Sequence, residues 1–205
     1  MEKRLILNVV KSSVMIHARN KINLPLSMPL PVVSTMKILG MVFDNNFAWD
    51  SHIDEVCKKA NQRFHFLRQL RPLVTPSELH QIYTASIRSL LEYACPVFVG
   101  LNSKLSKRLQ RIDRRAHGII CEGYMKGICD CNKETITRRR MNVSVKLFKE
   151  AENRHQYMLS GIIPRIHMFS GHYMMTYCRT EKLAKSFILS VIEHLNLKNS
   201  IDGEL

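Results

Sequence analysis

The four residues Thr75-Pro76-Ser77-Glu78 constrain the fold of this chain more than any other feature of its sequence. Threonine can accept a hydrogen bond from a free backbone N–H at a helix start, proline suits the first helical position, and glutamate three residues after the cap can bond back. The motif therefore predicts a helix that begins at Pro76. Arg71-Pro72 predicts the end of a preceding helix, because proline disfavours the helical conformation in the residue before it.

Apolar residues recur at intervals of three and four on both sides of this start, which predicts one buried helix face on each side. The upstream face belongs to a helix of about 20 residues that Asp50 or Ser51 can cap, and it consists of Ile53, Val56, Cys57, Ala60, Phe64 and Leu67. The downstream face consists of Leu79, Ile82, Tyr83, Ser86, Ile87, Leu90 and Leu91, and the helix stops at Cys95-Pro96. Tyr83, Tyr93 and Phe98 are expected in the core.

Three further helices follow from the same period: one from Asn102 or Ser103 to about Ile120, one over about 141–159 and one over about 181–197. Residues 128–140 are polar and are expected to form a loop.

Residues 1–44 read instead as β-structure. Short apolar runs at 5–7 and 14–16 precede a longer run, 32–43, that Gly40 interrupts, and the intervening NKINLPLSMPLP contains three prolines and cannot be a central strand. The expected fold is α+β and mainly α, with a small N-terminal antiparallel β-hairpin or sheet followed by a helical bundle. The expected domains are 1–48, 49–127 and 128–205.

Asp44 ends the longest apolar run, a place where metal-dependent enzymes often keep a ligand. It has no acidic neighbour within five residues, whereas a magnesium site needs two or three carboxylates. Asp44-Asn45-Asn46 suits a turn, because these side chains bond their own backbone. The sequence therefore favours a turn role for Asp44.

No catalytic, metal or cofactor site is predicted. The chain has no P-loop, G-x-G-x-x-G, H-E-x-x-H or G-x-S-x-G motif. The spacing H-x3-C-x7-C-x-C from His117 to Cys131 fits no common zinc site, so the six cysteines are expected to be reduced and structural. Isolated histidines such as His52 and His117 are expected at the surface or at helix ends.

The formal net charge of +14 indicates a polyanionic partner, with nucleic acid favoured over membrane. No apolar run approaches the ~20 residues of a membrane span, and no signal peptide or lipidation motif is recognisable. An intracellular protein, nuclear or cytoplasmic and not secreted, is expected.

The helix from about residue 103 to 120 carries the strongest functional signal. At 100° per residue, an apolar arc of under about 90° contains Leu105, Leu109, Ile112, Ala116 and Ile119. A separate arc of about 120° contains Lys104, Lys107, Arg108, Arg111, Arg114 and Arg115. Asp113 is the only carboxylate within the helix, so the repulsion between these cations is not relieved locally. A phosphate backbone would relieve it, which makes the six cations candidate nucleic-acid-binding residues.

Several segments together resemble the C-terminal end of the reverse transcriptase of non-LTR (LINE-type) retrotransposons. They are LNVVKSSVMIHAR, MKILGMVFDNNFAWDSHI, DEVCKKANQRFHFLRQLRPL, LHQIYTASIRSLLEYACPVF, KRLQRIDRRAHGII and CRTEKLAKSFILSVIEHLN. The resemblance implies a palm-remnant hairpin with a primer-grip-like motif at Lys37, Leu39 and Gly40, a thumb-like three-helix bundle and a helical tail. The family's paired catalytic aspartates have no counterpart here, so the resemblance implies a non-catalytic fragment that binds RNA, DNA or their hybrid with weak sequence preference.

Two alternatives remain. WDSHIDEVCKKANQRFHFLRQL is also similar to a short N-terminal module of AlkB-like tRNA-modifying proteins, which couple a methyltransferase with a 2-oxoglutarate dioxygenase. The sequence offers neither a two-His-one-carboxylate iron pattern nor a Gly-rich cofactor loop for those activities. The other alternative is a helical interaction module that self-associates through exposed apolar faces.

Overall fold

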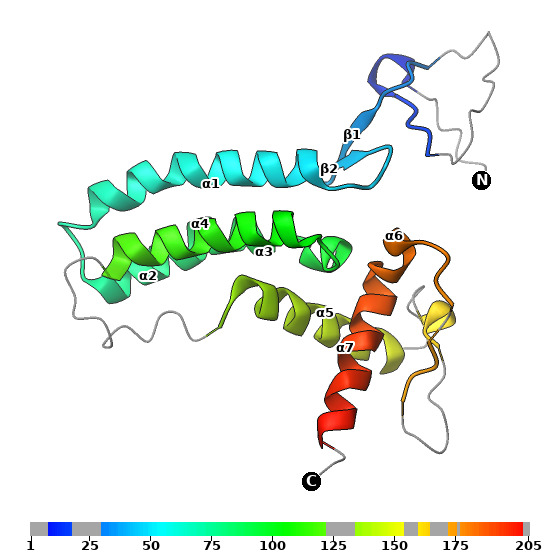
Figure 1. Cartoon of the computed structure of the whole chain (residues 1–205). Coiled ribbons are helices and arrows are strands. Elements are labelled where there is room, and N and C mark those ends of the chain that lie inside the picture. Colours follow the sequence, from blue (N-terminus) through cyan, green and yellow to red (C-terminus); the bar gives the residue numbers. More distant parts are fainter. Residues whose placement is uncertain are drawn as a thin grey trace, which may run out of the picture. The chain divides into compact units, whose positions relative to one another are not determined.

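A computed structural model describes residues 8–17, 30–121, 134–153, 160–164, 172–175 and 177–202. It divides into two compact units, Met1–Glu55 and Val56–Leu205, and the boundary falls inside a helix. The expected α+β, mainly helical fold is confirmed: one two-stranded antiparallel sheet near the N-terminus is followed by helices (Figure 1). The domain boundaries predicted from the sequence remain predictions.

The sheet of the first unit consists of β1 (Thr35–Ile38) and β2 (Met41–Asp44), paired from Thr35 opposite Asp44 to Ile38 opposite Met41. A two-residue turn with positive φ, 48° at Leu39 and 82° at Gly40, joins the strands, as tight hairpins require.

The short apolar runs before this hairpin differ from expectation. Val9–Lys11 forms a 3-10 turn, η1, and Val14 makes only an isolated parallel bridge to Val32. The expectation of an antiparallel strand at 14–16 was therefore wrong, since a run of three apolar residues does not specify a pairing partner. The run at 5–7 lies outside the described residues.

Asp44 holds the turn between β2 and the first long helix. Its carboxylate oxygens accept hydrogen bonds from the backbone N–H groups of Asn46 at 2.9 Å, Ala48 at 3.0 Å and Trp49 at 3.1 Å. This confirms the turn role. His52 was expected at the surface or at a helix end; it is the third residue of α1 and is buried, with Nδ1 accepting from the Val42 N–H at 3.4 Å.

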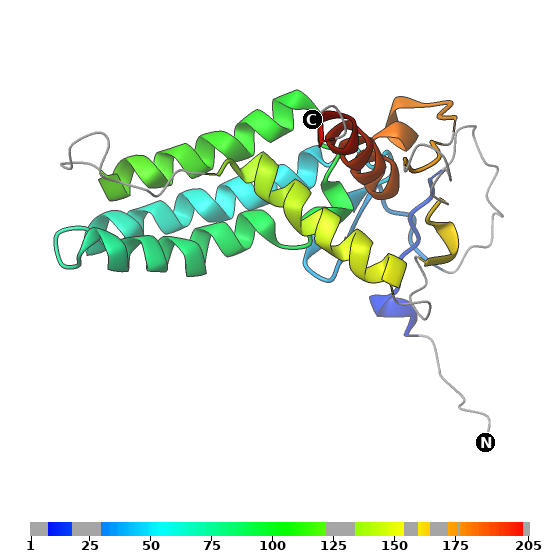
Figure 2. The ribbon, with the colours of Figure 1, turned by 90° about the horizontal axis from the view of Figure 1, so that it is seen from below.

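Three helical segments form the main body of the second unit (Figures 1 and 2). α1 (Asp50–Leu70) is followed by a composite helix of α2 (Pro76–Tyr83), η2 (Thr84–Arg88) and α3 (Ser89–Glu92), and then by α4 (Ser103–Cys121). A 3-10 turn, η3 (Cys95–Phe98), connects the last two.

The signals at these helix ends are confirmed except at the start of α1, and a second difference from expectation lies inside the composite helix. Thr75 and Glu78 form the expected capping box, and α1 ends before Arg71. Asp50 is the first helical residue of α1 rather than a cap outside it. Residues 84–88 are wound as a π-helix, which the apolar period does not distinguish from an α-helix.

The buried face of α1 matches the periodic positions, whereas the predicted downstream face is buried at four positions and half-buried at Ile82, Ser86 and Leu90. The six predicted positions on α1 are 0–8% exposed, and Tyr83 and Phe98 are in the core. Tyr93 is 52% exposed, so its predicted core placement was wrong. It follows the end of α3 at Glu92, where the helical period stops, so periodicity no longer places its side chain.

The C-terminal part contains α5 (Ile136–Asn153), the turn η5 (Ser160–Ile162), α6 (Glu181–Ala184) and α7 (Phe187–Asp202). α5 and α7 pack on each other through a second core cluster of Phe148, Tyr173, Val191, Ile192 and Leu195. α5 begins before the predicted residue 141, because Ile136 and Arg140 are buried by neighbouring helices despite the polar local sequence.

Within the described residues no helix has the length and apolar character needed to cross a membrane. The four cysteines in this part of the chain, Cys57, Cys95, Cys121 and Cys178, have free thiols. Burial raises the pKa of the Cys95 thiol to about 11, and the nearby Glu92 carboxylate adds to the rise. Cys95 is therefore a core residue, as an inert thiol is expected to be.

Candidate nucleic-acid interface

The apolar side of α4 anchors the helix in the bundle. Leu105, Leu109 and Ala116 are fully buried, and Ile112 and Ile119 are 6–7% exposed, so the predicted apolar arc is confirmed. Asn102 starts the helix by accepting a hydrogen bond from the Leu105 N–H at 2.9 Å. Each large apolar side chain buried in this way contributes about 1.5–3 kcal/mol, which fixes the rotation of α4 about its axis.

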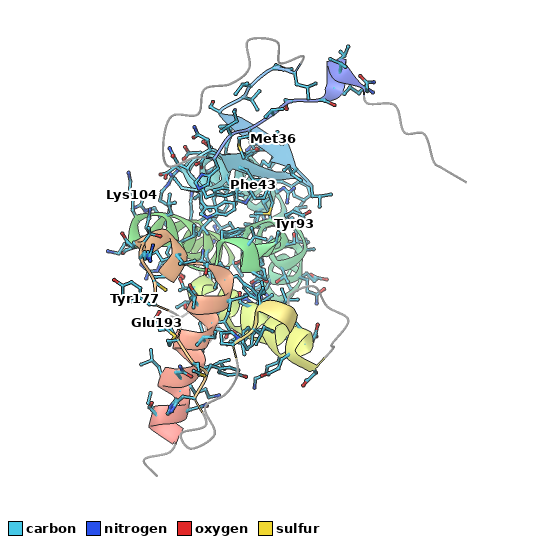
Figure 3. The ribbon with its side chains drawn as sticks, turned by 90° about the vertical axis from the view of Figure 1, so that its right-hand side faces the viewer. Met36, Phe43, Tyr93, Lys104, Tyr177 and Glu193 are labelled. Atoms are coloured by element: carbon cyan, nitrogen blue, oxygen red, sulfur yellow. The ribbon has the colours of Figure 1, made fainter. Side chains whose placement is uncertain are left out.

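A separate side of α4, next to the apolar arc, carries the six predicted cations, and we call it the basic face of α4: Lys104, Lys107, Arg108, Arg111, Arg114 and Arg115. Five of these residues are exposed, and Arg108 is half-buried. Figure 3 shows Lys104 near the first turn of the helix. The structure thus gathers the six on one side of one helix, while their role in binding remains a prediction.

Four of these cations, Lys104, Lys107, Arg111 and Arg114, have no hydrogen-bond or ion-pair partner among the described residues. Arg115 instead reaches α1, where its Nη1 donates to Asn61 Oδ1 at 3.0 Å and its guanidinium lies 4.8 Å from the centre of the Phe64 ring. Arg115, the last cation of the basic face, therefore contacts the surface of α1.

Asp113 is turned inward, away from the basic face. It is 2% exposed; Tyr83 Oη donates to its Oδ1, and Gln110 Nε2 donates to Oδ2 at 3.2 Å. His117 Nε2 lies 3.5 Å from Oδ1. Burial raises the pKa of Asp113, but the hydrogen bonds from His117 and Tyr83 outweigh it, and the net pKa is lowered. The Asp113 carboxylate, the only one of this helix, is thus ionised but buried in the core and does not lie on the basic face.

His117 was expected at the surface or at a helix end; it lies four residues before the end of α4 and is 6% exposed. It belongs to a buried polar cluster with Asp113, Tyr83 and His80, in which the His117 ring lies 5.0 Å from the Tyr83 ring and 5.9 Å from the His80 ring. The spacing of Asp113 and His117, four residues apart beside the apolar arc, could have indicated this pair, but their partners on α2 could not be found from a single helix.

The π-helical segment η2 places a cation, Arg88, beside this polar cluster. Arg88, at the end of η2, places its guanidinium 5.3 Å from the centre of the Tyr83 ring. Ser86 Oγ donates to the Ile82 carbonyl at 2.6 Å inside the same segment. Serine bonds of this kind often accompany helix distortion, and here the distortion lies next to the contact between α2 and α4.

The primer-grip-like residues occupy the hairpin of the first unit. Lys37 Nζ forms an ion pair with Glu55 Oε1 at 2.9 Å, Leu39 is 86% exposed, and Gly40 completes the turn. Lys37 therefore has an acidic partner, whereas four cations of the basic face have none among the described residues. The structure brings Lys37, Leu39 and Gly40 together, but it does not test their proposed role.

Comparisons with known proteins give one match. The family described as "Alkylated DNA repair protein alkB homolog 8, N-terminal" matches residues 49–89, which confirms the predicted similarity of the segment beginning at Trp49. The match covers less than half of the chain. No curated protein and no solved structure matches. The resemblance to reverse transcriptases gains no support from these comparisons and remains a prediction.

The matched segment corresponds to α1, α2 and η2, whose buried faces include Phe64, Leu79 and Tyr83. Within the described part of the chain, no three histidine, cysteine, aspartate or glutamate side chains are grouped so that they could hold a metal ion.

Proposed function

We propose that this chain binds the phosphate backbone of RNA, DNA or their hybrid through the basic face of α4, with weak sequence preference. The observation that carries the proposal is the set of four exposed cations without partners among the described residues: Lys104, Lys107, Arg111 and Arg114. Like charges at these spacings cost a few tenths of a kcal/mol per pair in an isolated helix. Bound phosphates would remove that cost.

The charge density of the basic face suits a nucleic acid. From Lys104 to Arg115 the helix rises about 16 Å at ~1.5 Å per residue. A duplex presents about ten phosphates over the same length, at one charge per ~1.7 Å of axis. Backbone contacts of this kind position a protein without reading bases, which is why weak sequence preference is expected.

The reverse-transcriptase resemblance makes this proposal more specific. If the chain derives from a retrotransposon reverse transcriptase, α1 to α4 correspond to its thumb, and the hairpin carrying Lys37, Leu39 and Gly40 corresponds to its primer grip. The paired catalytic aspartates of that family have no counterpart in this sequence, so the role proposed for these residues is binding. The match to the AlkB-homologue module concerns α1, α2 and η2, which we interpret as the scaffold that supports α4.

The salt dependence of binding tests the proposal. For the full chain and a short blunt DNA duplex, we expect log K to fall with log salt at a slope of about −3 to −5, corresponding to phosphate contacts by most of the basic face. Fluorescence anisotropy at several salt concentrations measures this slope. A flat salt response would reject phosphate binding.

A charge-reversal variant locates the interface. Arg111→Glu with Arg114→Glu should weaken binding and make the slope shallower by about two, because each lost phosphate contact removes about one unit. Its matched control is Lys146→Glu with Lys149→Glu, which changes the net charge equally on exposed positions of α5. Equal loss of binding in both variants would show that net charge, and not α4, governs the interaction.

Self-association is the second candidate function. Leu197 and Ile201, one helical turn apart on α7, are 61% and 68% exposed, which favours a contact between apolar faces. Size-exclusion chromatography with and without nucleic acid distinguishes the candidates. A dimer that is indifferent to nucleic acid would support self-association, whereas a monomer that shifts only with nucleic acid would support the basic-face proposal.

A further inference from the structure

α1 carries a second row of basic and polar side chains, which we call the α1 row: Lys58, Asn61, His65 and Arg68. Their spacing places them on one side of the helix, within an arc of about 80°. All four are exposed. Asp54, one turn before Lys58, is the last acidic residue on this side, and no acidic residue follows Glu55 in α1. From Lys58 onward the row therefore has no carboxylate from its own helix.

The α1 row has hydrogen-bond donors to offer a ligand. Lys58, His65 and Arg68 have no hydrogen-bond or ion-pair partner among the described residues. Asn61 uses its Oδ1 to accept from Arg115, and its Nδ2 has no partner in the described part of the chain. Phosphate oxygens accept hydrogen bonds from such groups, most strongly from the charged ones.

α1 and α4 lie side by side and run in the same direction (Figure 1). Arg115 on α4 contacts Asn61 and Phe64 on α1. Further along both helices, Ile120 of α4 and Arg68 of α1 line one cavity of about 460 Å³. The two contacts advance together along the chain, so the helices are parallel neighbours. The α1 row and α4 both belong to the second compact unit.

The α1 row and the basic face of α4 lie on the same side of this helix pair. Arg115 belongs to the basic face and Asn61 to the α1 row, so the two meet at the hydrogen bond between them. The composite helix lies on the other side: Arg63 of α1 bonds to η2, and Asp113 of α4 bonds to α2. The side that the composite helix leaves open thus carries cations from both α1 and α4.

We propose that the α1 row binds phosphates of a second strand, so that the chain holds a duplex with α4 on one strand and α1 on the other. The inference rests on the proposed function, in which the basic face of α4 binds a phosphate backbone. It adds the α1 row to the interface and makes a double-stranded nucleic acid the preferred ligand.

The separation of two packed helices suits two strands better than one. Packed helices lie about 8–10 Å apart, axis to axis, whereas neighbouring phosphates of one strand advance only ~3.4 Å along a duplex. The grooves that separate the two backbones of B-form DNA are ~6 Å and ~12 Å wide. Cations on two neighbouring helices therefore match two backbones on either side of a groove.

The test measures the affinity of the full chain for a blunt DNA duplex and for each of its separated strands, which are chosen so that neither can fold on itself. Fluorescence anisotropy at several salt concentrations gives the affinities and the salt slopes. We expect the duplex to bind more tightly than either separated strand, because only the duplex engages α1 and α4 together.

A charge-reversal variant assigns this preference to α1. Lys58→Glu with Arg68→Glu should make the duplex slope shallower by about two and abolish the preference for the duplex. The matched control, Lys146→Glu with Lys149→Glu on α5, changes the net charge equally at exposed positions and should keep the preference. Because Arg68 also lines the cavity, Lys58→Glu alone is a second variant and should make the slope shallower by about one. Circular dichroism confirms that each variant remains folded.

Three outcomes would overturn the inference: equal affinities of the wild-type chain for the duplex and the separated strands, α1 variants that behave like the control, or α1 variants that weaken the binding of duplex and separated strands equally. The last outcome would show that one strand contacts both helices. In each case a duplex affinity that still depends on Arg111 and Arg114 would leave the proposed function intact. Failure of the wild-type chain to bind any of these probes would reject both proposals.

Discussion

At the scale of single residues, Asp113 is the acidic residue of α4 that faces the interior of the bundle while the cations face outward. It occupies the one acidic position of a strongly basic helix, yet its carboxylate accepts hydrogen bonds from Tyr83 and Gln110 inside the bundle. A buried, hydrogen-bonded carboxylate holds α2 and α4 in register. The same orientation leaves the basic face without an acidic residue from its own helix.

Replacing this carboxylate should destabilise the chain in a pH-dependent way. Asp113→Asn removes an ionised acceptor from a buried network, so we expect the free energy of unfolding at pH 7 to fall by about 1–3 kcal/mol. The folded-state pKa of Asp113 is lowered from its ordinary value of 3.8. Its contribution is therefore complete above that value and is lost as the pH falls through the folded-state pKa.

Urea unfolding at pH 7 and at pH 3 measures this effect, and the gap between wild type and variant should narrow at the lower pH. Glu150→Gln, at an exposed position on α5, is the control and should change stability little at either pH. A gap that does not change with pH would mean that Asp113 is not ionised in the folded chain.

His80 also makes the stability fall with falling pH, but at higher pH values than Asp113. Burial and the nearby Arg88 and His117 lower the pKa of His80 from 6.5, so stability falls as the pH drops below that value.

At the scale of secondary-structure elements, two glycines differ in how closely other atoms surround them. A Cβ at Gly100, after η3, would lie 2.8 Å from the Lys185 carbonyl carbon and 2.9 Å from its Cα, in the connection between α6 and α7. A Cβ at Gly118 on α4 would meet no atom within 4 Å. The first glycine allows the C-terminal helices to approach the bundle, and the second only weakens a helix.

Alanine at these two positions should therefore have opposite effects. Gly100→Ala must push Lys185 away, and we expect it to lower the free energy of unfolding by about 1–3 kcal/mol, the usual cost of overpacking. Gly118→Ala should raise it by up to about 1 kcal/mol, since alanine is the better helix former. Urea midpoints measured by circular dichroism test both, and a stabilising Gly100→Ala would show that this contact does not form.

The sequence predicts those elements whose signals are local. The capping box at Thr75 and the two arcs of α4 follow from short-range chemistry and helical period, so the position of the basic face could be read in advance. The start of α5 could not, because Arg140 is buried with its Nη2 donating to Ser106 on α4, a contact that no local pattern encodes. The cavity lined by Arg68, Leu79 and Ile120 likewise requires three helices that meet only in the fold.

At the scale of the whole molecule, the chain divides into two units of very different size. The described part of the first unit contains a single two-stranded sheet and an aromatic cluster in which Trp49 lies 5.4 Å from Phe43 and 6.4 Å from Phe47, centre to centre. The second contains the helical bundle and the core cluster between α5 and α7. A two-stranded hairpin is marginally stable by itself, whereas a packed bundle unfolds cooperatively.

The two units should therefore unfold at different denaturant concentrations. Trp49 is the only tryptophan of the chain and reports on the first unit, while circular dichroism reports mainly on the helices of the second. In a urea titration of the full chain, we expect the fluorescence midpoint to lie below the circular dichroism midpoint, because the first unit has fewer buried contacts to lose.

Nucleic acid bound to α4 should raise the circular dichroism midpoint and leave the fluorescence midpoint unchanged, since ligand binding stabilises only the part that must be folded to bind. Coincident midpoints that move together would show instead that the two units fold as one.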